Sequence, residues 1–129
     1  MKKLFAVLVA LLVLAPLFVL PLTAFMVRTG FSHSDKPWAA GLVYRGARTR
    51  MRLLQYSTAG AVLQRAVTVF PRYRDVDRAH YWIALCCEKN EQPEQAVQWY
   101  QRFAERWPSH EWAAQARARA ENLKAQSDL

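Results

Sequence analysis

The sequence predicts an all-α protein: an N-terminal transmembrane helix, then a short array of antiparallel helical hairpins that ends in a C-terminal capping helix. Two observations predict this fold. A single apolar run without a charge occupies residues 4–27. After this run, apolar side chains recur at steps of three and four residues, with only four glycines in the whole chain and no alternating β-branched run. A chain of 129 residues leaves room for one small domain, which we expect at residues 39–129.

The first segment, residues 1–28, is expected to be a transmembrane anchor. Its apolar run is preceded by Lys2 and Lys3 and followed by Arg28. Twenty-four residues at about 1.5 Å each give a helix of about 36 Å, which is more than the roughly 30 Å of a hydrocarbon layer requires. Two prolines within the run are compatible with this prediction, because membrane helices tolerate kinks.

A cleaved signal peptide is the alternative interpretation of this segment, with cleavage after Ala24. We favour a retained anchor, because the run is longer than a usual signal core and Leu22 is bulky where a small residue is preferred. A short basic start before a long apolar run commonly directs the downstream domain across the membrane. We therefore expect a single-pass protein whose soluble domain lies outside the cytoplasm. The arginine- and alanine-rich composition favours a bacterial source, and so a bacterial inner membrane.

Residues 29–38 are expected to form a polar, turn-rich connector. Within it, Phe31 and Trp38 are either interfacial anchors at the lipid headgroups or packing residues beneath the following helices. A weak helix is expected from Ala39 to Gln55. Four arginines are expected to crowd one side of this helix: Arg45, Arg48, Arg50 and Arg52.

The next helix is expected to begin at a cap formed by Ser57 or Thr58 and to run to Phe70. Pro71 then ends it. Its apolar face consists of Ala59, Val62, Leu63, Ala66, Val67 and Phe70.

Residues 79–108 are expected to form one complete helical hairpin. Asn90 is expected to take the left-handed conformation that ends the first helix, and Pro93 to stand in the first turn of the second. Two amphipathic helices joined by so short a turn fold back as an antiparallel pair. The predicted apolar stripes are Ala79, Ile83, Ala84 and Cys87 on the first helix, and Ala96, Val97, Tyr100, Phe103, Ala104 and Trp107 on the second.

This hairpin resembles the tetratricopeptide repeat family. Small Ala84 and Ala96 stand where the family needs little side chain at the helix contact, Tyr100 where it needs an aromatic residue, and Pro108 where it ends the repeat. The segment from Asn90 to Val97 resembles the turn between the two helices of a repeat, although Asn90 replaces the usual glycine. The resemblance implies a repeat protein that binds other proteins, with the first helix of each repeat on the binding face.

An internal repeat is indicated by Pro71 and Pro108, which are 37 residues apart. After the second proline, Ser109 is expected to cap a last helix from about His110 to Gln126, which covers the apolar face of the final hairpin. Its inward residues are expected to be Ala113, Ala116, Ala120 and Leu123.

The positive charge is concentrated next to the anchor. Residues 28–78 have a net charge of +7 and residues 79–129 of −1, out of +8 for the whole chain. A basic segment beyond an anchor is expected to lie near anionic lipid headgroups, where each charge contributes about 1 kcal/mol. We assign this contact to Arg45, Arg48, Arg50 and Arg52. Nucleic-acid binding by the same basic half is the alternative, but no recognised motif accompanies it.

Sequence patterns of catalysis are missing. The three histidines are scattered, and there is no Gly-rich phosphate loop, nucleophile elbow or helical pair of metal ligands. We therefore expect neither an enzyme nor a bound cofactor or metal. Cys86 and Cys87 are adjacent on a helix, so their side chains point about 100° apart and cannot pair with each other. Both are expected to be reduced and to pack as small apolar residues.

These observations predict a membrane-anchored scaffold or accessory subunit that binds a protein partner in a membrane complex. The alternatives are an exported soluble adaptor released by cleavage and a basic nucleic-acid-binding helical module. The partner is expected on the side of the first hairpin helix that faces away from the core, and on the capping helix beside it. The two tryptophans of this set have an alternative role as packing residues. The expected contact residues are Arg78, Tyr81, Trp82, Leu85, Trp112, Gln115 and Arg119.

Overall fold

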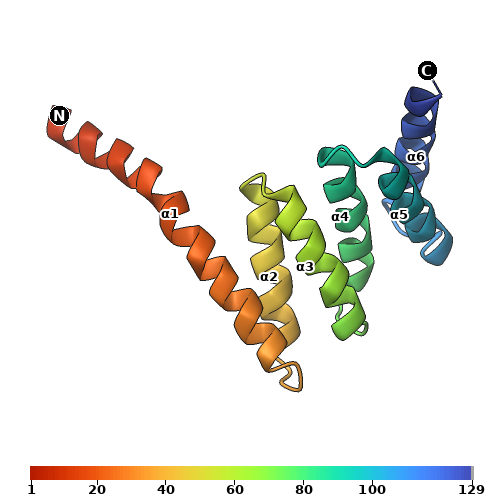
Figure 1. Ribbon diagram of the computed structural model, residues 1–129, viewed down its shortest axis with the longest axis horizontal. Coiled ribbons are helices and arrows are strands. Elements are labelled where there is room, and N and C mark those ends of the chain that lie inside the picture. The colour runs from red at the N-terminus through yellow and green to blue at the C-terminus, as the bar shows by residue number, and fades with distance from the viewer. Residues whose placement is uncertain (129) are drawn as a thin grey trace.

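The computed structural model describes residues 1–128, which form six α-helices and no strand within that range. Each helix packs against the next one along the chain, so the molecule is an extended row of antiparallel neighbours (Figure 1). The predicted all-α fold with a long apolar N-terminal helix is therefore confirmed. In chain order the helices are α1 (Lys2–Ser32), α2 (Ala39–Arg52), α3 (Tyr56–Val69), α4 (Val76–Lys89), α5 (Pro93–Arg106) and α6 (Ala113–Ser127).

The helices recur at a single interval of 37 residues. Helices α2 and α3 begin at residues 39 and 56, and α4 and α5 begin at residues 76 and 93. Helix α6 follows α4 by the same interval, at residue 113. The connections alternate in the same way, short at 53–55 and 90–92 and longer at 33–38, 70–75 and 107–112. The interval predicted from two prolines is thus the interval of the helices themselves.

The two short connections have the same backbone geometry. Leu54 and Glu91 both have left-handed conformations, with φ of 61° and 57°. The amide after each of them donates to the carbonyl five residues back, from Gln55 to Arg50 and from Gln92 to Cys87, both at 2.9 Å. This is the Schellman arrangement, which satisfies the last carbonyls of a helix. The prediction that Asn90 is left-handed was wrong by one residue, because the motif places the reversal at the second residue after the helix.

Helices α3 and α6 do not begin at the predicted caps. Helix α3 starts at Tyr56 directly after the short turn, and no side chain caps it, so neither Ser57 nor Thr58 has that role. Helix α6 starts at Ala113 rather than near His110, because residues 107–112 form successive tight turns first. Within these turns, the backbone N–H of Trp112 donates to Nδ1 of His110 at 3.0 Å.

The apolar stripes of the predicted hairpin form the centre of the core. The four residues of the α4 stripe are buried, and so are four of the six on α5, with Val97 and Trp107 half-buried at the margin. Pro93 occupies the first turn of α5, as its fixed φ favours. Cys86 lies against Gly60 of α3. A Cβ atom at position 60 would lie 3.1 Å from the Cβ of Cys86, so the two helices approach closely at this glycine. The inward alanines predicted for α6 are also buried.

Helix α1 extends beyond the predicted anchor. It continues to Ser32, so the connector expected at residues 29–38 begins only at His33. Every residue from 1 to 18 is exposed, whereas Thr23 is only 1% exposed and Gly30 is buried against α2. Helix α1 is long and apolar enough to cross a membrane by length and composition. Only its N-terminal half is free of contact with the rest of the chain.

The C-terminal part of α1 takes the position of a repeat helix. Residues 19–32 stand 37 residues before α3, and they pack on α2 as α3 packs on α4. Phe31 packs inward, with its ring centroid 6.1 Å from that of Phe70 and the guanidinium of Arg65 4.1 Å from its ring. Trp38, on the α1–α2 connection, is 49% exposed. The structure therefore shows Phe31 as a packing residue, whereas Trp38 lies on the surface of the connection.

Candidate protein-interaction face

Helices α2, α4 and α6 present side chains to one another along one side of the array. The guanidinium of Arg48 on α2 lies 5.2 Å from the ring of Trp82 on α4. Nη1 of Arg119 on α6 lies 3.0 Å from Oε2 of Glu88 on α4. Because these helices are spaced by 37 residues, Arg45, Trp82 and Arg119 occupy the same position on successive helices. We define the α2/α4/α6 face as Arg45, Arg48, Arg78, Trp82, Leu85, Gln115 and Arg119.

Several of the predicted partner-contact residues are accessible on this face. Arg78 and Gln115 are exposed, and Trp82 and Leu85 are half-buried. Trp112 lies at the edge of the face, directly before α6, and is also half-buried. The guanidinium of Arg78 lies 5.5 Å from the ring of Trp112, an arrangement in which the cation meets the negative face of the indole. Both tryptophans also pack against the core. They therefore contribute to the core and leave part of each ring on the surface.

Tyr81 is not on the surface, and the expectation that it is exposed was wrong. The residue is 7% exposed. Its ring centroid lies 5.4 Å from that of Tyr100, 5.5 Å from Phe103 and 5.1 Å from Trp112. Helix α4 is contacted by α5 and also by α6, so its buried stripe is wider than one hairpin requires. Burial raises the pKa of the Tyr81 hydroxyl.

Arg119 is held in place by a polar network below the face. Its Nη1 donates to both carboxylate oxygens of Glu88, at 3.2 and 3.0 Å, and the hydroxyl of Tyr100 donates to the same carboxylate. Burial, followed by the hydrogen bond to Glu88, raises the pKa of Tyr100, which keeps this hydroxyl protonated as a donor. The network joins α4, α5 and α6 and fixes the position of the guanidinium.

A pocket of about 100 Å³ between α2 and α4 extends the face in a direction that the partner prediction missed. The rings of Tyr44 and Tyr73 stack at 4.4 Å behind it. Among residues 1–128, Arg74 has an ion-pair partner, Asp75 at 3.6 Å, while no carboxylate pairs with Arg45 or Arg48. The pocket is lined by Tyr44, Arg45, Arg48, Tyr73, Arg74, Asp75 and Trp82. The 37-residue interval from Trp82 back to Arg45 is the signal that could have identified it.

The prediction that the four arginines of α2 lie on one side of the helix was wrong. Arg45 and Arg48 line the pocket beside α4. Arg50 turns the opposite way, and its Nε donates to Oγ1 of Thr23 on α1 at 3.1 Å. Arg52 is exposed at the C-terminal end of α2. Positions 45, 48 and 52 share a helix side at about 100° per residue, whereas position 50 falls on the other.

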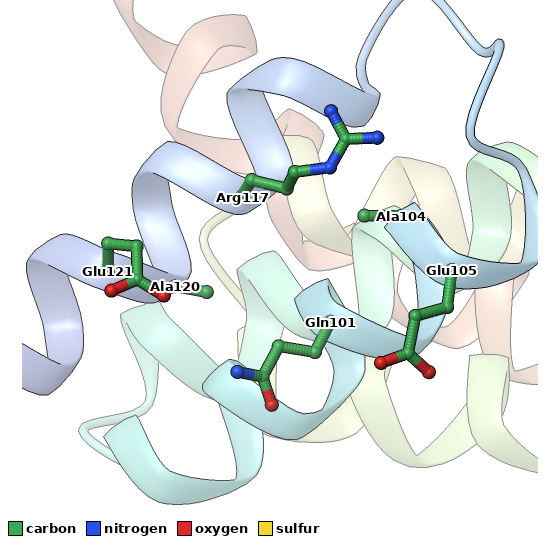
Figure 2. Close-up of a pocket in the computed structure, with 6 residues that line it drawn as sticks. All are labelled: Gln101, Ala104, Glu105, Arg117, Ala120 and Glu121. Atoms are coloured by element: carbon green, nitrogen blue, oxygen red, sulfur yellow. The ribbon is translucent and has the colours of Figure 1, made fainter.

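A second pocket, of about 570 Å³, lies between α5 and α6 and has a different character (Figure 2). Ala104 and Ala120 form its floor. Gln101 and Glu105 from α5 and Arg117 and Glu121 from α6 surround it, with the guanidinium apart from both carboxylates. The residue 37 positions before Glu121 is Ala84, at the equivalent place on α4, and it is fully buried. A carboxylate in that position makes this side of α6 suitable for water rather than for another packed helix.

Cys86, Cys87 and His80 are packing residues rather than members of a reactive site. Within residues 1–128, no group of three or more His, Cys, Asp or Glu side chains is placed to hold a metal ion. Cys86 and Cys87 are free and buried, and burial raises the pKa of Cys86 to about 12. His80 lies between Trp99 and Trp107, at centroid distances of 5.5 and 5.1 Å. Burial, together with the charge of Arg106, lowers its pKa to about 4.

No model of a known protein family matches this sequence, and no curated protein matches it. A functional assignment therefore depends on the geometry, burial and charge of the described residues.

Proposed function

We propose that this protein is a membrane-anchored interaction module, in which α1 holds the helical array at a membrane and the α2/α4/α6 face binds a protein partner. The observation that carries the proposal is the face itself. It presents Arg48 and Arg78 beside the partly exposed rings of Trp82 and Trp112, and it has Arg45, Trp82 and Arg119 at equivalent positions of successive helices. The resemblance to the tetratricopeptide repeat family supports the same use of the first helix of each pair.

The packing of α1 supports a retained anchor. Cleavage after Ala24 would remove Thr23, which is buried and accepts the hydrogen bond from Arg50. It would also leave the rest of residues 19–32 as a short helix without its first turns. Short isolated helices are marginal in water. An exported adaptor released at this position would lose part of its own fold, so we propose that α1 is retained as a single-pass anchor. From the composition and the basic N-terminus, we propose further that the membrane is a bacterial inner membrane and that the array lies outside the cytoplasm.

Charge supports a partner with acidic side chains. Arg45 and Arg48 have no carboxylate partner among residues 1–128, and Arg74 and Arg78 stand close by on the same side. Tryptophan and arginine are the residue types that most often contribute binding free energy at protein interfaces. Opposite charges across an interface also speed association. An acidic segment with an apolar side chain for the Trp82 ring fits this surface.

The proposal is tested by affinity purification of the full chain from membranes in mild detergent, comparing two double variants. Arg45→Ala with Arg48→Ala removes from the face two arginines that have no carboxylate partner among residues 1–128. Arg102→Ala with Arg117→Ala removes two exposed arginines from α5 and α6 outside it, and serves as the matched control.

We expect the first variant to retain its partner about tenfold less well, equivalent to about 1.4 kcal/mol, because two contacts of hot-spot type are lost. The control should retain it fully, and raised salt should weaken the wild-type complex. Equal retention by both variants would place the interface elsewhere. Extraction of the chain from membranes by alkaline carbonate would contradict the anchor.

A further inference from the structure

We propose that the α2–α3 turn is a second membrane contact, in which Leu54 enters the boundary between the lipid headgroups and the hydrocarbon. This inference rests on the proposed anchoring by α1. It adds a contact that fixes how the array stands on the bilayer.

The position of the turn is set by the packing of α2 on α1. Arg50 is in the last turn of α2, and its Nε lies 3.1 Å from Oγ1 of Thr23. Because the two helices are antiparallel, the turn after α2 lies beyond Thr23, toward the N-terminus of α1. Figure 1 shows this turn on the side of the array toward which the N-terminal half of α1 extends.

The length of exposed α1 brings the edge of the hydrocarbon to the same level. Lipid cannot surround α1 where α2 covers it, so the span must end near Thr23. Residues 4–22 give about 28 Å at 1.5 Å per residue, close to the roughly 30 Å of a hydrocarbon layer. The end of the span and the α2–α3 turn therefore coincide in depth.

Leu54 is unusual for a residue in a water-exposed turn. It is 72% exposed and has a φ of 61°. Glycine, and next asparagine, are the residues that take this conformation readily, and a leucine side chain is disfavoured in it. Neither backbone preference nor packing against the core accounts for a leucine here. Contact with lipid does, because an exposed leucine is stabilised where hydrocarbon begins.

The chain contains its own comparison for this residue. Glu91 stands 37 residues later with a φ of 57° and the same pair of turn hydrogen bonds, and it is also exposed. The α4–α5 turn is separated from α1 by α2 and α3 (Figure 1). Two turns of equal geometry thus carry leucine next to the anchor and glutamate farther from it. If α1 tilts in the bilayer, the α4–α5 turn changes its depth more than the α2–α3 turn does, because it is farther from α1. The depth of Leu54 is therefore set by α1 more closely than the depth of Glu91.

The experiment compares the two turns in the full chain reconstituted into phosphatidylcholine vesicles containing a minor fraction of phosphatidylglycerol. The single variants Leu54→Cys and Glu91→Cys are labelled with the environment-sensitive dye NBD. The native cysteines are buried and exclude the dye in the folded chain. Lipids with a nitroxide at a shallow position on the acyl chain report contact with the bilayer by quenching.

We expect blue-shifted emission and strong quenching at position 54, and water-like emission with several-fold weaker quenching at position 91. The same emission and quenching at both positions would overturn the proposal. A blue shift at position 54 without nitroxide quenching would also overturn it, because the turn would then contact protein, such as a second copy of the chain.

A second comparison tests the leucine itself. The dye is placed at Gln55→Cys, with and without Leu54→Asn, since asparagine tolerates the left-handed conformation and preserves the turn. Leu54→Asn is expected to reduce the quenching at position 55 at least twofold. Unchanged quenching would overturn the role of Leu54. A chain that does not stay with the vesicles after carbonate treatment would contradict the anchor instead, so the two failures are distinguishable.

Discussion

The contact between α1 and α2 is tested most directly at Gly30. A methyl group at this position would overlap Cγ2 of Val43 and come within 3.0 Å of the carbonyl oxygen of Ala39. The valine is fully buried and β-branched, so its side chain has few alternative rotamers, and the carbonyl belongs to the backbone of α2. Gly30→Ala can therefore be accommodated only if the two helices move apart.

A glycine on α2 provides the matched control. A methyl group at Gly41 would meet only the hydroxyl oxygen of Tyr73, at 3.9 Å. Alanine is favoured over glycine within a helix, so Gly41→Ala is expected to stabilise the fold by about 0.5–1 kcal/mol. At Gly30 the same gain is opposed by overpacking, which typically costs about 1–3 kcal/mol. The expected net loss is about 1–2 kcal/mol.

The assay is thermal unfolding of the full chain in detergent, followed by tryptophan fluorescence, because four of the five tryptophans belong to the array after α3. A change of 1 kcal/mol shifts the melting temperature of a domain of this size by about 4–8 °C. Gly30→Ala should therefore melt several degrees below the wild type, and Gly41→Ala slightly above it. If Gly30→Ala melts at or above the temperature of Gly41→Ala, α1 does not pack on α2 as described.

Three further predictions concern buried polar groups. The pKa of His80 is lowered in the folded state, so the unfolded chain binds more protons between about pH 6.5 and pH 4, and stability falls as pH drops through that window. From about pH 7 to pH 5 we expect a loss of about 1–2 kcal/mol in denaturant unfolding, and His80→Phe should abolish it. Glu88→Gln is expected to lower stability by about 1–2 kcal/mol, because Arg119 loses its charged acceptor; an unchanged denaturation midpoint would contradict the network. Cys86 and Cys87 should react with maleimide only as fast as the chain unfolds, whereas rapid labelling of the folded protein would show that they are accessible.

The helices and most of the core could be predicted from the sequence, because the spacing of apolar side chains directly reflects which side of a helix is buried. Ala79, Ile83 and Tyr100 are buried as their spacing indicates. The pattern of a single hairpin cannot show what a third helix covers. Tyr81 was assigned to the surface for that reason, although the connection before α6 brings Trp112 against it.

The sequence was less informative about how much of α1 is covered by α2, and about which neighbouring helix each arginine of α2 contacts. An uncharged run shows that a segment is apolar, but lipid and a packed helix are equally compatible with it. Thr23 lies within that run and is nevertheless covered by α2. In the same way, Arg45 and Arg50 have the same charge in the sequence, and only the packing of α2 directs one toward α4 and the other toward α1.

The continuity of α1 determines how the array can search for a partner. A flexible linker would let a domain sweep a volume whose radius grows with the square root of its length. If α1 enters the bilayer as proposed, the same helix is also the first helix of the packed row, so no flexible linker separates the proposed binding face from the membrane and the face stays near one height. Capture then depends on two-dimensional diffusion of the whole protein and on partners that arrive at that height. Any torque from a bound partner would then be transmitted to the part of α1 proposed to span the bilayer, where Pro16 and Pro21 are the positions at which the helix bends most easily.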